Sequence, residues 1–382
     1  MDVSRYTNTK ELRFTIEFVT PCFLGGADGN AEVRTAPFKN LLRRWWRIAR
    51  RSSRNDLSTR SLWEEEGKLF GSKEMHEKSK ITLRIISENV TYEKPDGIRF
   101  GGDLFIHPEV DTNGGKVTFE SYLGMGPIFG TEFQKSYIRE NSNIKIALTM
   151  PNDNNTVYYI ITSLTLIDMY GTIGSRSRNG WGSIKIVPEN FRLLPENIIF
   201  GASENITSFF AENNGRYYPQ RLGYNRTENN INGLLCWQSV EDFSDWSDAM
   251  YFLAKAYMKL RTHFSLADTR KGELNKRHLL GYPVTHHSVN LWEQNEENRL
   301  PSQLLFKVIK IQGNGNVREN RFKAQILHLP YKISLEWNEN LGSQESVWKE
   351  VHSFLDTYHE DNEGMDKDLM RQYTFNNDGG TH

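Results

Sequence analysis

The order of strand-like and helix-like segments in the first half of the chain most narrows what it can fold into. Strands are indicated by alternation of polar and apolar side chains and by β-branched residues, and helices by apolar residues that recur every three to four positions. Six such segments follow one another before residue 190. They are a strand at 12–19, a helix at 37–51, strands at 80–87 and 143–150, a helix at 156–171 and a strand at 183–188.

This order, βαββαβ, is typical of the ferredoxin-like (RRM-like) arrangement, an α+β fold with two helices on one face of an antiparallel sheet. We therefore predict a first domain at residues 1–190, with an insertion at 88–142 that protrudes as a hairpin or loop. A helix at 246–262, strands at 304–311 and 324–333 and a helix at 347–358 repeat part of the order. The prediction for 191–382 is a second, degenerate ferredoxin-like domain with insertions, in tandem with the first.

Composition restricts where a polyanion could bind. The 382 residues carry a net charge of −1, so any site for nucleic acid must be a local concentration of positive charge. Only Cys22 and Cys236 are present, and no His, Asp or Glu set has metal-ligand spacing, so neither metal nor other cofactor is expected. The N-terminal segment lacks the apolar core of a secretory signal, and no apolar stretch is long enough to span a membrane. We expect a cytoplasmic protein without a membrane partner.

The strongest local concentration of positive charge lies in the first predicted helix. Residues 39–54 contain seven Lys or Arg and two Trp and no acidic residue. On a helix, Trp45 joins an apolar stripe, whereas the opposite basic stripe would meet phosphates and Trp46 would be free to stack on a base. The alternative is an amphipathic surface helix whose arginines are only solvated. The basic stripe comprises Lys39, Arg43, Arg47, Arg50 and Arg54.

Two glycine-rich turns are expected to border the same cleft as this helix. The loop GSRSRNGWG at 174–182 offers three glycines for close backbone approach, Arg176 and Arg178 for phosphates, and Trp181 for stacking. In the expected fold this loop emerges near the exit of the first strand, where the turn at 20–34 begins. The alternative for the loop is a turn that needs glycine only for its geometry. The candidate backbone-approach positions are Gly25, Gly26, Gly174, Gly180 and Gly182.

These stretches resemble a known family, the RAMP superfamily of CRISPR ribonucleoproteins, and within it the first RAMP subunit of the type III-B effector, the Cmr complex. The resemblance is carried by TPCFLGGAD at 20–28, by AEVRTAPFKNLLRRWWR at 31–47 and by GSRSRNGWGSI at 174–184. A weaker similarity lies at 299–311, RLPSQLLFKVIKI. Asn40 departs from the family pattern, which has glycine where the helix opens.

The resemblance implies a non-catalytic RNA-binding subunit that acts in antiviral defence. It would hold the 3′ part of the CRISPR RNA, its paired target RNA, or both, and its other partners would be further RAMP subunits of the Cmr complex. The RNA-binding residues that the resemblance implies are Arg34, Lys39, Arg43, Arg47, Arg50, Arg176 and Arg178. The residue pattern adds Arg54 of the basic stripe, and Trp46 and Trp181 as rings that would stack on bases, to the expected RNA-binding set.

Two other functions remain open from the sequence. Some RAMP proteins cleave RNA with a histidine, and His286 and His287 form the only adjacent pair, so a metal-independent endoribonuclease is one alternative. Paired histidines on a surface are more often structural or solvated than catalytic. The other alternative is a scaffold whose basic helix docks an acidic protein and never contacts RNA.

Overall fold

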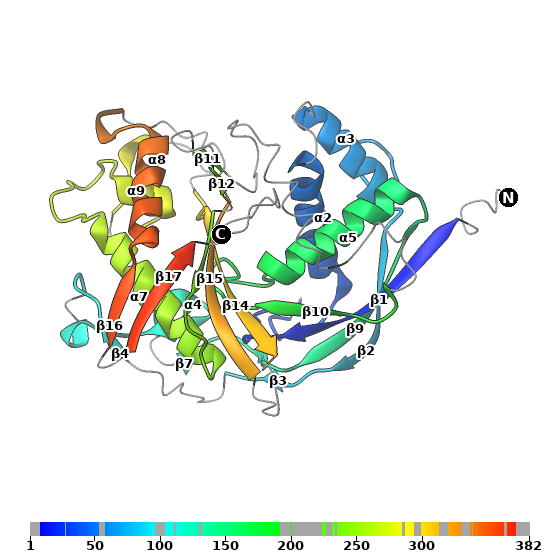
Figure 1. Cartoon of the computed structure of the whole chain (residues 1–382), viewed down its shortest axis with the longest axis horizontal. Coiled ribbons are helices and arrows are strands. Elements are labelled where there is room, and N and C mark those ends of the chain that lie inside the picture. The colour runs from blue at the N-terminus through cyan, green and yellow to red at the C-terminus, as the bar shows by residue number, and fades with distance from the viewer. Residues whose placement is uncertain are drawn as a thin grey trace, which may run out of the picture.

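An antiparallel four-stranded sheet and two helices organise the first half of the chain in the computed structural model (Figure 1). The strand order is β10-β1-β9-β2, and Ile16 of β1 lies opposite Ile186 and Ile144. The six elements predicted before residue 190 are confirmed to within three residues at each end. They are β1 (Thr9–Phe18), α2 (Thr35–Ser52), β2 (Thr82–Asn89), β9 (Asn143–Pro151), α5 (Asn154–Tyr170) and β10 (Ile184–Pro188). The structure describes residues 8–26, 28–52, 58–95, 104–110, 112–129, 132–191, 200, 224–226, 231–233, 235–284, 287–293, 299–312, 320–329, 337, 339–362 and 365–371.

A buried apolar core joins α2 and α5 to one face of this sheet. Alternate residues of β1, including Phe14 and Ile16, point into this core, as the alternating pattern of the strand predicts. Trp45 is 1% exposed and stacks on Tyr170 of α5 with ring centroids 6.0 Å apart, so its predicted core position is confirmed. A helix absent from our prediction, α3 (Thr59–Phe70), follows α2. The hydroxyl of Ser58 caps its first turn by accepting a hydrogen bond from the Ser61 amide.

The second half contains a five-stranded antiparallel sheet in the order β14-β15-β13-β17-β16. The predicted helices and the first predicted strand are confirmed as α7 (Trp246–His263), α9 (Gln344–Asp356) and β14 (Leu304–Gln312). The second predicted strand is observed as β15 (Asn320–His328), which starts earlier, and positions 330–333 lie outside the described residues. The other elements are β13 (Cys236–Ser239), β16 (His359–Asn362), β17 (Met365–Arg371), β11 (Tyr224–Arg226), β12 (Ile231–Gly233), α8 (Asn290–Glu293) and the 3-10 turns η3 (Lys276–Leu280) and η4 (Glu339–Leu341).

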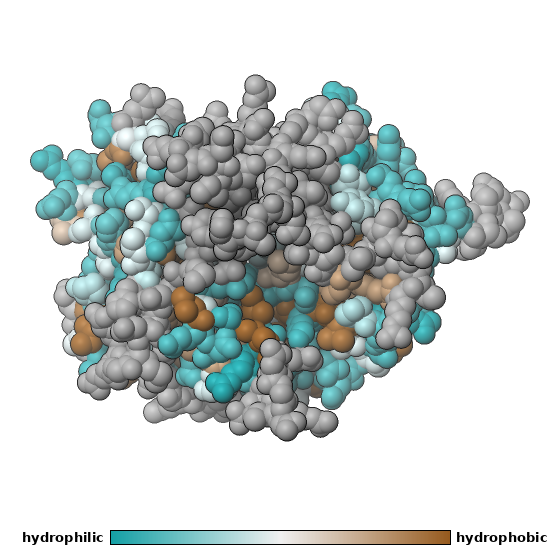
Figure 2. All heavy atoms as spheres, in the orientation of Figure 1, coloured by the Kyte–Doolittle hydropathy of each residue, from teal (hydrophilic) through white to brown (hydrophobic). Residues whose placement is uncertain are grey.

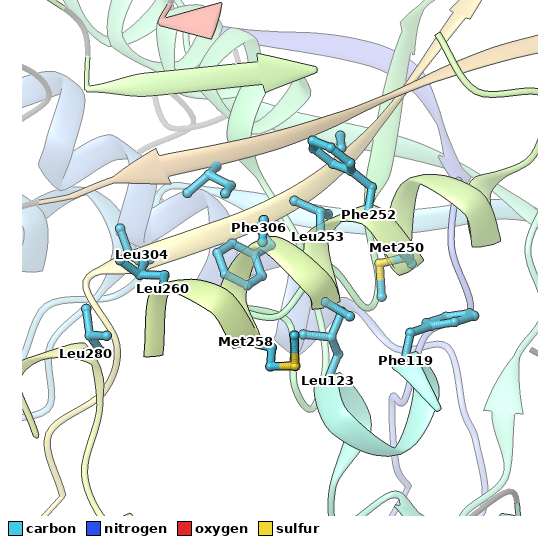
Figure 3. Close-up of a cluster of buried hydrophobic side chains, with 14 of the residues drawn as sticks. Phe119, Leu123, Met250, Phe252, Leu253, Met258, Leu260, Leu280, Leu304 and Phe306 are labelled. Atoms are coloured by element: carbon cyan, nitrogen blue, oxygen red, sulfur yellow. The ribbon is translucent and has the colours of Figure 1, made fainter. Parts of the chain in front are cut away.

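The insertion between β2 and β9 packs on the second half, so the prediction that it protrudes is wrong for most of its length. Phe119 and Leu123 of α4 contact the apolar side of α7 (Figure 3). Glu109 forms an ion pair with the buried Arg277 at 2.6 Å. The insertion is rich in aromatic residues, and burying these apolar side chains against the second half is more favourable than leaving them in water. Its elements are β3 (Tyr92–Glu93), β4 (Leu104–Ile106), η1 (Thr112–Gly115), β5 (Lys116–Thr118), α4 (Phe119–Gly124), β6 (Ile128–Phe129), β7 (Glu132–Phe133) and β8 (Tyr137–Ile138).

The two sheets meet at β14, where a buried lysine links the halves. Lys307 is 2% exposed, and its ammonium donates hydrogen bonds to the carbonyl oxygens of Ile167 and Asp168 at 3.0 and 2.5 Å. A cation suits this position because carbonyl oxygens at a helix C-terminus carry partial negative charge. Burial nevertheless lowers the pKa of Lys307 to about 8. Figure 2 shows hydrophobic side chains gathered in the middle of one face, over the area of β10 and β14, with hydrophilic side chains on both flanks.

A buried histidine pair makes the second half sensitive to acid. The Nδ1 atom of His328 lies 2.8 Å from Nε2 of His352, and its Nε2 lies 3.1 Å from Oε1 of Gln303. Burial lowers the pKa of His328 to about 3, whereas an unfolded histidine titrates near 6.5. Between pH 6.5 and 3, His328 therefore binds a proton in the unfolded chain but not in the folded chain. This contribution to stability is complete above pH 6.5 and is lost as the pH falls towards 3.

We expect the free energy of unfolding to fall by up to about 1.4 kcal/mol per pH unit in this window because of His328. Urea unfolding at a series of pH values measures this slope. The variant His328→Gln should flatten it. Equal slopes in the wild type and His328→Gln would contradict the assignment.

Candidate nucleic-acid interface

The two glycine-rich turns lie side by side, as the sequence predicts. The amide of Ser175 donates to the Phe23 carbonyl at 2.9 Å, and the amide of Gly182 donates to the Pro21 carbonyl at 2.9 Å. The hydroxyl of Thr20 donates to the Gly180 carbonyl at 2.9 Å. These backbone contacts fix the loop at 174–182 against the segment that leaves β1.

The loop glycines are required by packing within the protein, whatever their role toward a ligand. Gly174, Gly180 and Gly182 all have positive φ, at 96°, 91° and 65°. A Cβ added at Gly174 would lie 2.8 Å from the Phe23 carbonyl oxygen, and one added at Gly182 would overlap the Ile173 carbonyl oxygen. The protein itself therefore fills the space that a side chain at these positions would occupy.

The two glycines of the first turn differ from those of the loop. Gly25 is exposed, and no atom lies within 4 Å of an added Cβ. A Cβ at Gly26 would lie 2.6 Å from a carboxylate oxygen of Glu32. Of the five candidate backbone-approach glycines, Gly25 is the one with open space beside it.

Neither tryptophan predicted to stack on a base has an exposed ring. Trp46 is 3% exposed, and its ring meets that of Phe70 in α3 edge to face at 5.7 Å. Trp181 is fully buried, with ring centroids 5.4 Å from Phe23 and 6.2 Å from Trp246. In this structure neither residue presents an indole ring to a base, because both rings are buried in the apolar core.

Most of the basic stripe faces α3, which carries acidic residues. The Glu66 carboxylate pairs with both Arg43 and Arg47. Arg50 is 7% exposed, and its Nε and Nη2 donate to the Glu65 carboxylate at 2.6 and 2.9 Å. The predicted stripe is confirmed as a helix face, but three of its five members pair with carboxylates of a neighbouring helix.

The remaining two members of the stripe have different positions. The ammonium of Lys39 donates to the Ser79 hydroxyl at 2.6 Å, and burial followed by the charge of Arg43 lowers its pKa. Arg54 lies outside the described residues.

Arg44, which the stripe analysis did not select, joins α2 to the glycine-rich loop. Its Nη2 atom is buried and has no hydrogen-bond partner within the described part of the chain. Burial lowers the pKa of Arg44 to about 10, and the nearby charges of Arg178 and Arg47 add to this effect. We call Arg44, Arg47 and Arg178 the arginine cluster. Arg44 lies between the apolar and basic stripes of the helix. Only its proximity to the glycine-rich loop identifies it, and helix periodicity does not reveal that proximity.

The two turns carry further cations beside the glycine-rich loop. The guanidinium of Arg178 donates to the Ser302 carbonyl of the second half. Arg176 is exposed, and burial of part of its side chain and the charge of Arg299 lower its pKa. Arg34 is exposed and donates to the Gly25 carbonyl at 2.8 Å. Cations from α2, from both turns and from the segment at 299–302 thus border this part of the molecule.

An exposed aromatic residue lies on the hairpin that adjoins Arg176. A Cβ added at Gly126 would lie 3.4 Å from Nη2 of Arg176, which places the turn before β6 beside the loop. Phe129 of β6 is 77% exposed and Met125 is 54% exposed. The sequence analysis missed both because the insertion was not placed against the loop. Phe129 offers the open ring face that Trp46 and Trp181 lack.

Of the two candidate catalytic histidines, only His287 lies among the described residues. His287 is partly buried, and its amide donates to the Val284 carbonyl at 3.1 Å, whereas His286 lies outside the described residues. The nearby Tyr282 hydroxyl accepts a hydrogen bond from the Val289 amide at 3.1 Å. Among the described residues no group of three or more His, Cys, Asp or Glu is arranged to hold a metal ion. None of the described helices combines the length and apolar character needed to cross a bilayer.

Comparison with known proteins relates the first half of the chain to one superfamily. Residues 15–185 match the family model of the RAMP superfamily. No curated protein matches the chain. The crystal structure of apo Cmr1 from Pyrococcus furiosus is similar at 15% identity over 86% of this chain and 91% of that chain, with a TM-score of 0.47. A chain in the cryo-EM structure of Type III-B Cmr-beta with cognate target RNA and AMPPnP is 13% identical over 90% and 99% of the two chains, with a TM-score of 0.42.

Proposed function

We propose that this chain, with its RAMP superfamily match at residues 15–185, is a non-catalytic RNA-binding subunit of a type III-B CRISPR (Cmr) effector in antiviral defence. In this role it holds the 3′ part of the CRISPR RNA, its duplex with target RNA, or both, and assembles with other RAMP subunits. The observation that carries the proposal is the arginine cluster, where α2 and the glycine-rich loop bring three guanidinium groups together.

The cluster is suited to a phosphate. Three like charges disfavour one another, and a buried N–H without a partner costs about 1–3 kcal/mol. A phosphate beside the cluster would offset the repulsion that Arg44 experiences from Arg178 and Arg47. Lys39 on the same helix, and Arg34 and Arg176 on the two turns, are further cations that an RNA backbone could use. Phe129 adds a ring on which a base can stack.

The proposed scaffold is a tandem of ferredoxin-like domains at residues 1–190 and 191–382. The sheet order β10-β1-β9-β2 of the first half supports it, as does the order β17-β13-β15-β14 of the second half. In each half, helices follow the strands that come first and third along the chain, β1 and β9 in the first half and β13 and β15 in the second, as βαββαβ requires. The bond from Phe306 to the Arg178 carbonyl at 2.8 Å ties the second sheet to the loop that carries the cluster.

Binding of a fluorescent single-stranded RNA to the purified chain, measured by anisotropy at several salt concentrations, tests this function. We expect the logarithm of affinity to fall linearly with the logarithm of salt, with a slope of about −0.7 per phosphate contacted, near −2 for the arginine cluster alone. Absence of binding, or binding that salt does not change, would contradict the proposal. RNA recovered intact after long incubation is also expected, and cleavage abolished by His287→Ala would favour the endoribonuclease instead.

A further inference from the structure

Helix α3 supplies two buried or half-buried carboxylates to the cations of α2. Glu66 is 3% exposed, and its two oxygens pair with Arg43 and Arg47, whose Nη2 lies 3.1 Å from Oε1. Glu65 pairs in the same way with Arg50, whose guanidinium also lies 4.9 Å from the centre of the Tyr159 ring. The sequence between residues 39 and 54 holds no acid, so all of this neutralisation comes from α3.

Helix α3 is held by packing that does not depend on these ion pairs. Leu62, Leu69 and Phe70 are buried in the core of the first half, and Phe70 contacts the ring of Trp46. The glutamates can therefore exchange partners while the helix stays in place. The side chains of Arg43 and Arg47 are 32% and 47% exposed, so solvent and ligands reach them beside Glu66.

We propose that Glu65 and Glu66 of α3 compete with RNA phosphates for the arginines of α2. Glu66 pairs with Arg43 and Arg47 until a phosphate displaces its carboxylate. The proposal rests on the function argued above and adds to it a regulation of the same site. The two glutamates offset half the positive charge of Lys39, Arg43, Arg47 and Arg50. An RNA that does not also contact Arg44 and Arg178 would therefore bind the basic stripe only weakly. RNA anchored at Arg44 and Arg178 has the high local concentration of phosphate needed to compete with an attached carboxylate.

Glutamine substitutions on α3 provide the test with a matched control. Glu66→Gln and Glu65→Gln remove a competing carboxylate, whereas Glu64→Gln removes the same charge from an exposed pair with Arg60 on the same helix. Each variant is titrated with the labelled RNA at several salt concentrations, and its melting temperature is recorded. We expect Glu66→Gln to bind about five- to tenfold more tightly than Glu64→Gln at low salt, with a salt slope steeper by about 0.7, because Arg43 becomes available for one more phosphate while Arg47 already belongs to the arginine cluster.

Glu65→Gln keeps the test open if Glu66→Gln does not fold, because Glu65 is 34% exposed. We expect it to bind two- to threefold more tightly than Glu64→Gln. Affinities and slopes of both variants equal to those of Glu64→Gln would overturn the competition, as would weaker binding by either folded variant. If the wild type itself does not bind RNA, the proposed function fails; if the wild type binds and the glutamine variants match the control, only the competition fails.

Discussion

Replacing Arg44 by glutamate is expected to lower the affinity of this chain for single-stranded RNA by about two orders of magnitude at low salt. The substitution removes one cation from the arginine cluster. It also places a carboxylate beside Arg178 and Arg47, where it competes with phosphates for both. The salt slope should become shallower by about 2, since three phosphate contacts contribute about 0.7 each.

Folding of this variant is expected because glutamate would find two cationic partners. Anisotropy titrations at several salt concentrations measure the effect, and circular dichroism verifies the fold. Arg60→Glu is the control: it changes the net charge equally at a site on α3 whose present pair is with Glu64. Equal losses in the two variants would show that affinity depends only on net charge, and the placement of RNA at the cluster would be wrong.

The methionine variant Arg44→Met separates function from stability. It removes the charge and the buried Nη2 that lacks a partner, so the free energy of unfolding should rise by about 1 kcal/mol. RNA affinity should nevertheless fall about tenfold, through the loss of one phosphate contact. A residue that only supports the fold would show the opposite pattern, with lower stability and unchanged affinity.

Periodicity identified the right helix and the right faces of α2 but could not assign partners to them. The apolar stripe is buried, as the spacing requires. The opposite stripe pairs with Glu65 and Glu66, and nothing in residues 39–54 reveals that an acidic helix will pack there. For the same reason Arg44 escaped the analysis, because its importance comes from Arg178, 134 positions away in sequence but close in space.

The predicted elements have a clear periodicity of polar and apolar residues. Most of the elements that were not predicted are short and depend on pairing with segments far away in the sequence. β14 and α7 have long, clear patterns and were found. β13 has only four residues, and its neighbours in the sheet, β15 and β17, lie far along the chain. The insertion is predicted as a protruding hairpin or loop, because nothing in its own residues indicates that α7 packs against its aromatic side chains. Trp46 and Trp181 are buried instead of exposed, since a tryptophan in a basic segment can pack in the core as readily as it can stack on a ligand.

Gly182→Ala is expected to cost more than about 4 kcal/mol of folding stability. Gly182 has a φ of 65°, a conformation in which a side chain crowds the backbone. An added Cβ would overlap the carbonyl oxygen of Ile173, a backbone atom that cannot rotate away. That same segment is fixed, because the Ile173 amide donates to the Gly182 carbonyl at 2.9 Å and the Gly182 amide donates to Pro21. Relief of the overlap would therefore separate the loop from the exit of β1.

Gly25→Ala, in the partner turn, is the matched control. The φ of Gly25 is not positive and an added Cβ would have open space around it, so the same change should alter the free energy of unfolding by less than about 0.5 kcal/mol. Urea unfolding of both variants measures the difference. RNA binding gives a second readout, because a folded Gly182→Ala chain would displace Arg178 from Arg44 and lose affinity. If Gly182→Ala is as stable as Gly25→Ala, the loop can move without cost, and its glycines would then be free to serve a ligand instead of the fold.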